Sequence, residues 1–589
     1  MNSFTISKEK LYNAVINGAI AVINAKNHLN EINVFPVRDR DTGTNLASLM
    51  NSIIENSKIG KDINETLVSI SNAALRGSKG NSGIIFSQFF YGITKVATEE
   101  NIDFSNIIDK AESGYKYAYE SIEEPVEGTI ITLMKKWPQF LKNKNNQNSD
   151  YLKDLLASSN ELQIELEKTK TTLNIFKKYD VVDAGAKAFA IFVEGFTNSL
   201  NDDFVNIILN DNKTSIVKHE YLDNEDIKYR YCTEVLIKTN LEREDISLKT
   251  KHFGDSLVIG KSSDYLKIHI HTNNPAEFIE VVESFALIIE TKVDDMKNQY
   301  QIQKSKQKDI CILTDSIADI SQDIIDDLNI QVLPISLNTD SATYFDKLTI
   351  NNEILKKIIL KNEGYPKSSS PSIKDIDDLL SFLLNNYKKV IVITVSSKMS
   401  STYNAFRNAI NKMGNNDVKL IDSKSNSVSQ GLLVLKAKNL IDKGLNFDDV
   451  VEQIKKDIDK TKILVHVDTL DNMVRGGRIK KSLGYIAKII RLKPIVSIDK
   501  NGEGIVPKKT LGQRRNINKI IKEVIKANEK YGIESYAISH VNNLKLAESL
   551  KTKLINALKI TPEYVTNTSS VIALNAGDKA VAVGYIRRD

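Results

Sequence analysis

The chain has few cysteines and no long apolar run. Only two of its 589 residues are cysteines, Cys232 and Cys311, which excludes a scaffold held together by several disulfides. The opening residues MNSFTISKEKLYNAV lack the basic and then apolar order of a signal peptide. The most apolar stretches, such as VINGAIAVINA, are shorter than the roughly 20 residues of a membrane helix and contain Asn. We therefore expect a cytoplasmic protein with no transmembrane segment, which meets lipid through a pocket or through transient contact with a membrane surface.

Long blocks of one charge are also absent. The chain has 80 Lys and Arg against 75 Asp and Glu, a net charge of +5, and the two signs alternate in stretches such as KDIDKTKI and IIKEVIKANEK. This alternation is typical of solvated helix faces, and no concentrated basic stripe of the kind that binds nucleic acid is present. We predict no nucleic-acid partner. A cytoplasmic enzyme or carrier fits the composition best.

The apolar pattern changes twice along the chain and predicts a multidomain protein. Spacings of three and four dominate residues 1–200 and predict an all-α domain. Short β-branched runs such as TEVLIKT and LKIHIHT predict a small α+β domain over residues 211–303. From 309 to 589, apolar runs alternate with helical stretches and predict an α/β domain with a mostly parallel sheet. Within it, IVSIDKNGEGIVPKKTLG predicts a hairpin and SVIALNAGDKAVAVGYI predicts two strands.

The stretch NVFPVRDRDTGTNL sets two aspartates one residue apart at the start of a predicted helix. If the segment is extended, Asp39 and Asp41 face one way while Arg38 and Arg40 face the other, so both carboxylates can converge on one cation. Mg²⁺ prefers such hard oxygen ligands and completes its shell with water and substrate phosphates. The alternative is an aspartate that only caps the helix, which would explain one of the two.

A second segment, LRGSKGNSGIIFSQFF, gathers three glycines and several small polar residues ahead of an apolar helix. Small residues let backbone N–H groups approach a phosphate, and the helix dipole favours an anion there. The spacing is not that of a P-loop, and an ordinary turn is the alternative. Two further joints, EPVEGTIITL and VVDAGAKAF, each place an acid and a glycine at a helix boundary.

Taken in order, these four segments resemble the signatures of the ATP-binding domain shared by dihydroxyacetone kinases and the catalytic subunit of bacterial fatty acid kinase. The resemblance covers about the first 200 residues and implies an eight-helix barrel that holds ATP through Mg²⁺. It implies that Asp39 and Asp41 bind the metal, with Asn33 and Thr44 nearby. It further implies that the phosphates are contacted by Ser78, Asn81, Ser82 and Gly83, and that the nucleotide site is lined by Thr129, Asp183 and Gly185.

The first signature departs from the family, which normally reads Pro-Asp-Gly-Asp where this chain reads Arg38-Asp39-Arg40-Asp41. If both arginines point outward, the metal site survives. If Arg40 reaches the phosphates, its guanidinium could assist catalysis or replace a cation, which makes Arg40 a catalytic candidate. An active kinase and a domain that binds nucleotide without turnover both stay open at this point.

The predicted middle domain holds Cys232 in YRYCTEVLIKT and two histidines, His269 and His271, in LKIHIHT. Residues two apart on a strand share a face, so the histidines point the same way. A thiolate and two imidazoles are a plausible ligand set for Zn²⁺, whereas simple packing and surface roles are the alternative. The domain resembles the middle domain of the fatty acid kinase catalytic subunit, where the matching cluster is an active or metal site.

The C-terminal half carries the segments TDS, PKSSSPS, SSTY, RGGRI and KPIVSI in order, and it resembles the DegV family of fatty-acid-binding proteins from about residue 309 to the end. Without the family, most of these serines would be expected simply to cap helices. The resemblance implies a buried acyl tunnel whose carboxylate end is bound by Ser368 and Ser400, with Ser369 close by. Asn575 stands where the family has a histidine, and an Asn can donate a hydrogen bond but carries no charge.

Together the resemblances imply that one chain fuses a kinase with a lipid carrier and converts ATP and a fatty acid into acyl phosphate and ADP. Expected cofactors are ATP with Mg²⁺, and Zn²⁺ in the middle domain. Expected partners are a fatty acid, separate DegV-family carriers and a second copy of the chain in a homodimer. One alternative is a fatty-acid-binding or regulatory protein whose kinase domain is impaired. Another is a kinase for a hydroxylated small molecule, which would need a base or covalent anchor that the sequence does not reveal.

Overall fold

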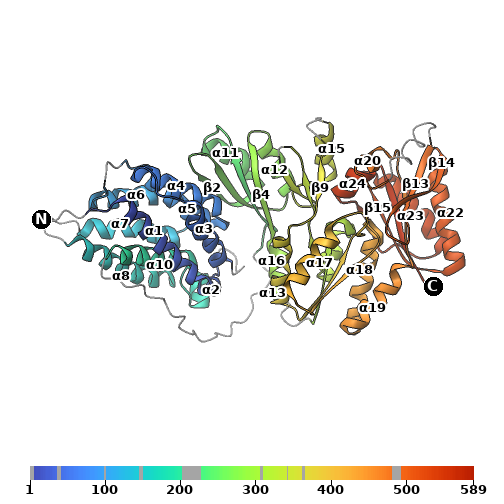
Figure 1. Ribbon diagram of the computed structural model, residues 1–589, viewed down its shortest axis with the longest axis horizontal. Coiled ribbons are helices and arrows are strands. Elements are labelled where there is room, and N and C mark those ends of the chain that lie inside the picture. The colour runs from blue at the N-terminus through green and yellow to red at the C-terminus, as the bar shows by residue number, and fades with distance from the viewer. Residues whose placement is uncertain are drawn as a thin grey trace. The chain divides into compact units, whose positions relative to one another are not determined.

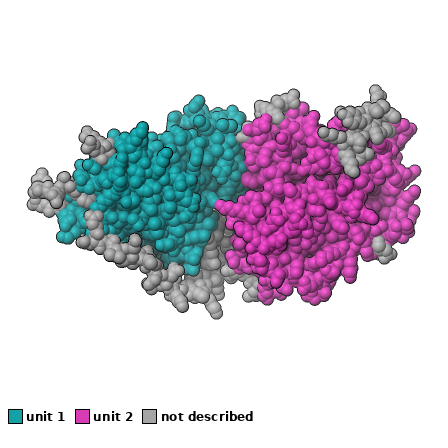
Figure 2. Space-filling model, viewed as in Figure 1, with its two compact units in different colours: residues 1–300 teal, residues 301–589 magenta. Residues whose placement is uncertain are grey.

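The computed structural model describes residues 5–35, 41–97, 101–144, 150–201, 227–304, 309–340, 342–360, 365–479 and 492–588. They form two compact units, one within residues 1–300 and the other within 301–589 (Figure 2). No helix in these ranges combines the length and the hydropathy that a bilayer crossing requires.

The first part of unit 1 is helical, which confirms the all-α prediction. Its centre is α5, whose residues 83–92 are all buried, and Phe86 stacks on Phe90 with ring centroids 5.4 Å apart. Asp62 and Asp103 begin two helices by accepting a backbone N–H in the first turn, as helix caps do. The helices in the described ranges are α1 (Lys8–Asn24), α2 (Lys26–Glu31), α3 (Thr42–Asn56), α4 (Ile63–Gly77), α5 (Gly80–Ile93), α6 (Phe104–Glu120), α7 (Ile130–Lys144), α8 (Tyr151–Thr169), α9 (Asn174–Tyr179) and α10 (Ala184–Ser199) (Figure 1).

The second part of unit 1 is the predicted small α+β fold. Its antiparallel sheet has the strand order β2-β3-β1-β4, and every residue of β3 is buried. Its elements are β1 (Tyr231–Lys238), α11 (Arg243–Thr250), the 3₁₀ turn η1 (Lys251–Phe253), β2 (Gly254–Lys261), β3 (Leu266–Thr272), α12 (Pro275–Glu283), β4 (Leu287–Asp295) and α13 (Met296–Lys304).

Strand β2 joins this sheet to the helices. Val258 belongs to the helical core, and the backbone N–H of Ile259 donates to the carbonyl of Ser121 at 3.0 Å. The amide of Gln88 on α5 accepts from the N–H of Lys261 at 2.9 Å and donates to its carbonyl at 3.0 Å. A Cβ at Gly260 would come within 2.8 Å of Ile84, so the missing side chain permits the close approach. Sheet and helices thus share a core within unit 1.

Unit 2 contains a parallel sheet, as predicted, in the order β11-β10-β5-β6. Its central strands, β5 and β10, are rich in Val, Ile and Leu and are buried except at their first residue, as parallel strands covered on both faces usually are. A small three-stranded sheet, β8-β7-β9, lies in the same unit. These strands are β5 (Ile310–Asp315), β6 (Gln331–Leu333), β7 (Ser336–Asn338), β8 (Thr343–Phe345), β9 (Lys367–Ser369), β10 (Lys389–Thr394) and β11 (Val418–Asp422).

The prediction of a mostly parallel sheet is wrong for the rest of unit 2. Its six-stranded sheet, in the order β14-β13-β12-β17-β15-β16, is antiparallel except where β15 pairs with β16. Strand direction is set by which segments pair, and local apolar runs do not encode it. The predicted hairpin is present as β13 and β14. The strands are β12 (Thr461–His466), β13 (Leu492–Ile498), β14 (Gly504–Leu511), β15 (Ile533–His540), β16 (Val565–Asn567) and β17 (Val581–Arg587).

The prediction of two strands at the chain end is also wrong, because SVIALNA forms helix α24 and only the second stretch is a strand. The hydroxyl of Ser569 accepts from the N–H of Ile572, and buried carboxylates accept from the N–H groups of Ser569 and Ser570, so the helix start is capped. The other helical elements of unit 2 are η2 (Ser316–Ala318), α14 (Gln322–Leu328), α15 (Asn352–Leu360), α16 (Ile373–Leu384), α17 (Thr402–Met413), α18 (Ser427–Asp442), α19 (Phe447–Ile458), α20 (Asp471–Arg475), α22 (Gln513–Tyr531) and α23 (Leu544–Leu558), with α24 at Ser570–Ala576.

Candidate functional site

A pocket in unit 1 brings together residues from five separate sequence segments. Its lining combines the start of α3 and the residues before it, the first turn of α5, three strands of the small antiparallel sheet and the start of α13. Seven residues singled out from the sequence lie there, and the described lining consists of Asn33, Phe35, Asp41, Thr42, Asn45, Gly80, Asn81, Ser82, Cys232, His269, His271, Asp294, Met296 and Gln299. One pocket is therefore shared by the motif of residues 33–46 and by Cys232, His269 and His271, which we call the Cys/His cluster. The two are nearly 200 residues apart in the chain.

Local geometry explains how the helical residues reach this pocket. Asp41 is the residue before α3, and its side chain makes no capping hydrogen bond, so a capping role does not account for it. Gly80 adopts φ +62°, which a glycine tolerates without strain, and a Cβ there would come 2.7 Å from the amide nitrogen of Asn45. The turn at Gly80 leads directly into Asn81 and Ser82 in the first turn of α5.

Strand register places the other half of the lining. Antiparallel pairing sets Cys232 of β1 opposite His271 of β3 and opposite Asp294 of β4. The next pair on the same face sets Glu234 opposite His269. Because directly opposed residues point to the same side of a sheet, these side chains form one compact polar group.

Three members of this group suit a zinc ion. One ligand atom from each of Cys232, His269 and His271 lies within 4.8 Å of the other two. His269 Nε2 is buried without a hydrogen-bond partner among the described residues. Burial, with a contribution from His269, lowers the pKa of His271 to about 3, which keeps this imidazole in the neutral form that binds metals. Burial also raises the pKa of the Cys232 thiol, so a zinc ion would have to displace its proton on binding. The donor set fits zinc with a fourth position open.

Charged residues that were not singled out from the sequence surround this cluster. Burial alone would raise the pKa of Glu234, but the Lys267 ammonium and the contact with His269 bring it well below its usual value. Lys292 forms an ion pair with Asp294 on the same strand. For Glu234 and Lys267 the signal was present in the sequence, because each lies two positions from Cys232 or His269 on a strand, where side chains share a face. Lys292 and Asp294 lie on β4, which carries no residue singled out from the sequence.

Six other residues predicted from the sequence lie outside the described lining of this pocket. Three make local hydrogen bonds: Ser78 Oγ donates to the carbonyl of Leu75 at 2.8 Å, Thr129 Oγ1 donates to that of Val126 at 2.8 Å, and Thr44 Oγ1 accepts from Asn30 Nδ2 at 3.0 Å. Gly83 lies in α5, where a Cβ would come 3.5 Å from the backbone of Ser78.

The remaining two, Asp183 and Gly185, begin α10. Asp183 caps this helix by accepting from the N–H of Ala186 at 2.7 Å, and burial raises its pKa to about 7. A Cβ at Gly185 would lie 3.4 Å from Ser82 Oγ, which places the start of α10 beside the glycine segment.

Two predicted site residues of the first motif, Asp39 and Arg40, lie outside the described residues together with Arg38. Among the described residues of this motif, Asp41 is the acidic residue that lines the pocket.

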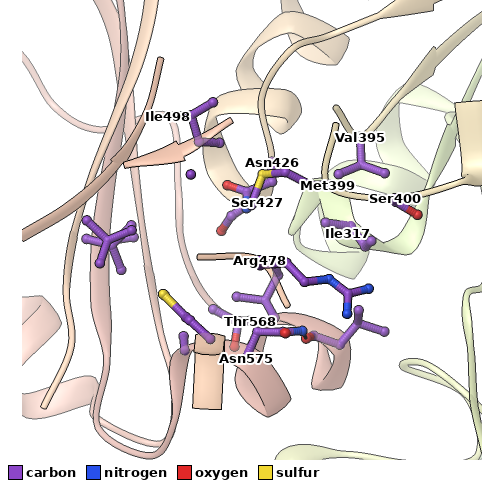
Figure 3. A pocket seen from close by; sticks show the side chains of 18 of the residues that line it. Ile317, Val395, Met399, Ser400, Asn426, Ser427, Arg478, Ile498, Thr568 and Asn575 are labelled. Carbon is purple, nitrogen blue, oxygen red and sulfur yellow. Dashed lines mark hydrogen bonds between the residues drawn. The ribbon is translucent and has the colours of Figure 1, made fainter. Parts of the chain in front are cut away.

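Unit 2 contains a larger pocket, about 1060 Å³ including its opening (Figure 3). Ile317 and Val395 come from the parallel sheet region, and Val465, Val496 and Val581 come from three neighbouring strands of the antiparallel sheet. The cavity thus lies where residues of the two sheets and α24 meet, and most of its lining is apolar. Such a lining suits an apolar chain.

All four residues predicted to bind a lipid carboxylate line this pocket: Ser368, Ser369, Ser400 and Asn575. Ser369 Oγ accepts from Asn338 Nδ2 at 3.1 Å, and Ser400 Oγ lies 2.9 Å from Thr402 Oγ1. Asn575 Nδ2 donates to the carbonyl of Val571 at 2.8 Å.

Arg478 adds a cation to these four predicted residues, and the sequence signal for it was the RGGRI stretch. Its Nη2 donates to Ser368 Oγ at 3.3 Å, and it lines the same pocket as Ser400 and Asn575 (Figure 3). Burial lowers the pKa of Arg478 somewhat, but an arginine keeps its charge. One guanidinium, several hydroxyls and an amide are suitable partners for a carboxylate.

Buried carboxylates hold the wall of this pocket in place. Asp319 accepts from the N–H of Ser569 at 2.6 Å and from the hydroxyl of Ser427, and Asp346 accepts from the N–H of Ser570 at 2.7 Å. Burial raises the pKa of Asp319 to about 6 and also raises that of Asp346. Both acids therefore anchor the start of α24, the helix that carries Asn575.

Family models match three successive parts of the chain. The DAK2 domain matches residues 36–198, the FakA-like middle domain of fatty acid kinase matches 228–303, and the DegV family of uncharacterised proteins matches 309–588.

Curated relatives include an uncharacterized protein of Staphylococcus saprophyticus, 31% identical over 310 residues that make up 50% of this chain and 56% of that protein. An uncharacterized protein of Staphylococcus aureus is 31% identical over 305 residues, 49% of this chain and 55% of its own length. The chain thus spans about half the length of the curated relatives it matches.

Solved structures similar to unit 2 include a fatty-acid-binding DegV family protein from Thermus thermophilus, with 22% identity and a TM-score of 0.45 over 47% of this chain and 99% of that one. A fatty acid binding DegV family protein from Streptococcus agalactiae has 25% identity and a TM-score of 0.44 over 48% of this chain and all of its own. The chain thus carries a DAK2 domain, a FakA-like middle domain and a DegV domain, in that order.

Proposed function

We propose that this chain is an ATP-dependent kinase that phosphorylates the carboxylate of a fatty acid held in its own DegV domain. The observation that carries the proposal is the apolar pocket of unit 2, with Arg478 beside Ser368 in its lining. The order of the three domains, which includes a middle domain named for fatty acid kinase, supports the kinase half. A cytoplasmic location belongs to the same proposal.

The lipid half rests on the chemistry of the pocket. An acyl chain would lie against the apolar residues, because removing apolar surface from water stabilises the complex by about 25 cal/mol per Å². Its carboxylate would be bound by Arg478, Ser368 and Ser400, with Ser369 and Asn575 adjacent. Asn575 supplies an amide without charge, so among the described lining residues Arg478 is the cation available to the head group.

The nucleotide half rests on the pocket of unit 1. Mg²⁺ would be held by Asp41 together with Asp39, and it would neutralise phosphate charge. Asn33 and Thr44 would lie near the metal, and the glycine segment with Ser78, Asn81, Ser82 and Gly83 would contact the phosphates. Asn81 Oδ1 is buried without a hydrogen-bond partner among the described residues, so this oxygen is available to accept a hydrogen bond from a ligand. Thr129, Asp183 and Gly185 complete the proposed nucleotide site.

The proposed reaction needs no general base. The fatty carboxylate is already ionised near neutral pH, and one of its oxygens attacks the γ-phosphorus of ATP. As this P–O bond forms, the bond to the bridging oxygen breaks and ADP leaves with the electron pair. Arg478 and the serines would orient the carboxylate, and the unit 1 residues would fix the phosphates, so positioning carries most of the catalysis. Arg40 is proposed to add a guanidinium near the phosphates.

A zinc ion is proposed at Cys232, His269 and His271, where it would supply a positive charge beside the phosphate site. Separate DegV-family carriers and a homodimer are proposals about partners, and so is transient contact with a membrane surface.

The second candidate is a fatty-acid-binding or regulatory protein whose kinase domain binds nucleotide without turnover. The observation that favours it is the sequence Arg38-Asp39-Arg40-Asp41 in place of the usual signature. It predicts tight binding of Mg-ATP and lipid with no acyl phosphate.

Hydroxylamine trapping decides between the two. Purified protein is incubated with Mg-ATP and a panel of fatty acids, and acyl hydroxamate is measured with and without a separate DegV-family carrier. Hydroxamate that is lost in Asp41→Ala supports the kinase. If none forms under either condition while lipid and nucleotide both bind, the regulatory function replaces it.

A further inference from the structure

A buried ion pair in unit 1 joins the middle sheet to the glycine segment. Glu234 on β1 and Lys267 on β3 have side chains only 2% and 10% exposed, and Lys267 Nζ lies 3.4 Å from Glu234 Oε2. Burying two charges costs free energy that their attraction often fails to offset, so such a pair is weak evidence for a stabilising role. Its contacts indicate a more specific one.

Both partners reach the turn that begins α5. Glu234 Oε1 accepts a hydrogen bond from the N–H of Gly80, and Lys267 Nζ donates to the carbonyl of Ser78. The two contacts hold the chain on either side of Lys79, immediately before Asn81 and Ser82. The middle sheet therefore fixes the conformation of the proposed phosphate-binding segment.

The same carboxylate oxygen also reaches the Cys/His cluster. Glu234 Oε1 lies 3.4 Å from His269 Nδ1, while His269 Nε2 is the buried nitrogen without a partner among the described residues. A histidine that binds metal through one nitrogen usually donates its other N–H to a carboxylate or carbonyl, which fixes the ring. Glu234 is placed to be that acceptor.

We propose that Glu234 is a positioning residue that couples metal binding at Cys232, His269 and His271 to nucleotide binding at the glycine segment. With Nε2 as the metal ligand, His269 would keep its proton on Nδ1, and this N–H would hold Glu234 in the orientation that accepts from Gly80. The coupling rests on the nucleotide site of the proposed function and deepens it. Since coupling is reciprocal, nucleotide must tighten metal binding by the same factor.

Two simpler roles for these residues lead to different expected results. A purely structural ion pair would change stability but leave nucleotide affinity independent of metal. A direct attraction between the metal charge and the phosphates would couple the two sites without Glu234, and added salt would weaken that coupling.

The test measures Mg-ADP affinity by calorimetry on full-length protein that has been stripped with a chelator and then either left free or loaded with one equivalent of Zn²⁺. In the wild type we expect zinc to tighten Mg-ADP by at least about 5-fold, and Mg-ADP to tighten zinc by the same factor. In Glu234→Leu, which keeps a similar volume but removes both acceptor oxygens, zinc should still bind and its effect on Mg-ADP should fall below about 2-fold. The matched control is Glu242→Leu, which removes a carboxylate paired with Lys261 at 2.7 Å in the same domain and should keep the full effect.

Hydrogen exchange of the peptide that contains Gly80 gives a readout that needs no variant. If Glu234 orders the turn, zinc should slow hydrogen exchange at the Gly80 amide in the wild type. If the metal charge only attracts the phosphates directly, zinc should leave this exchange rate unchanged.

Each outcome separates this inference from the kinase proposal. Mg-ADP binding that is insensitive to zinc overturns the coupling and leaves the kinase intact. A zinc effect that persists in Glu234→Leu assigns the coupling to the metal charge and overturns the role of Glu234. Failure of Mg-ADP to bind in either metal state overturns the nucleotide site itself and, with it, the kinase.

Discussion

The two pockets of this chain are built in opposite ways. The pocket of unit 1 is polar, small and surrounded by buried charges, and strand register together with one glycine turn creates it. The pocket of unit 2 is larger and mostly apolar, with a cation, an amide and hydroxyls among its lining. Fixed charges suit a reaction whose substrate carries phosphates, whereas an apolar cavity suits a ligand that must leave water. The comparison predicts that changes in one pocket leave the ligand of the other unaffected.

The largest effect is expected from Asp41→Ala. Loss of a metal-binding carboxylate should lower acyl phosphate formation by at least about 1000-fold, because metal charge stabilises the transferring phosphoryl group by several kcal/mol. Fatty acid retained by the purified variant, measured by native mass spectrometry, should equal that of the wild type. A variant that loses lipid along with activity would show that the two pockets are not independent.

A pH-dependent stability effect is expected from Asp319 in unit 2. Burial raises its pKa from 3.8 to about 6, so the folded state favours the protonated acid. Its contribution to the free energy of unfolding is therefore fully present below about pH 4 and is lost as the pH rises through 6. The loss amounts to about 3 kcal/mol, because one pKa unit corresponds to about 1.4 kcal/mol. In Asp319→Asn this dependence should disappear, and the difference in unfolding free energy between variant and wild type should change across this range.

Urea unfolding followed by two probes isolates the effect. The single tryptophan, Trp137, lies in unit 1, so its fluorescence follows that unit, whereas circular dichroism follows both. The pH-dependent difference between Asp319→Asn and wild type should appear only in the unfolding transition of unit 2, which circular dichroism detects and tryptophan fluorescence does not. A difference between variant and wild type that stays constant from about pH 4 to 7 would contradict the prediction.

Arg478→Ala should weaken fatty acid binding by about 10- to 100-fold, because a hydrogen bond to a charged group contributes roughly 1.5–3 kcal/mol. Arg478→Lys should recover part of the loss by restoring the charge without the planar fork. Arg475→Ala is the matched control, since Arg475 stacks 4.5 Å over Tyr365 and is not among the described lining residues. Displacement of a fluorescent fatty acid measures all three. Equal losses in Arg475→Ala and Arg478→Ala would argue against a specific head-group contact.

The smallest effect is expected from Ser400→Ala, which removes one neutral hydroxyl and should weaken the same binding by about 2- to 10-fold. Mg-ADP affinity should stay unchanged in this variant. A loss larger than that of Arg478→Ala would reverse the assigned order of the two contacts and place the carboxylate nearer Ser400.

The sequence predicted residue types well where function depends on local pattern. Alternation on a strand placed His269 and His271 on one face, and the serine segments supplied Ser368 and Ser400 to a single pocket, as the structure shows. It failed for strand direction in the last sheet and for α24. Apolar runs look alike in parallel and antiparallel strands, and the residues that cap α24, Asp319 and Asp346, lie more than 200 positions away.

By itself, the sequence determined the order of an all-α part, a small α+β part and an α/β part, because apolar periodicity is a local property of the chain. Only the tertiary structure decided that Asp41, the glycine segment and the Cys/His cluster share one pocket, and that Glu234 contacts both Gly80 and His269. These contacts depend on pairing register and on the packing of β2 against α5, which link residues far apart in the chain and leave no mark in local spacing.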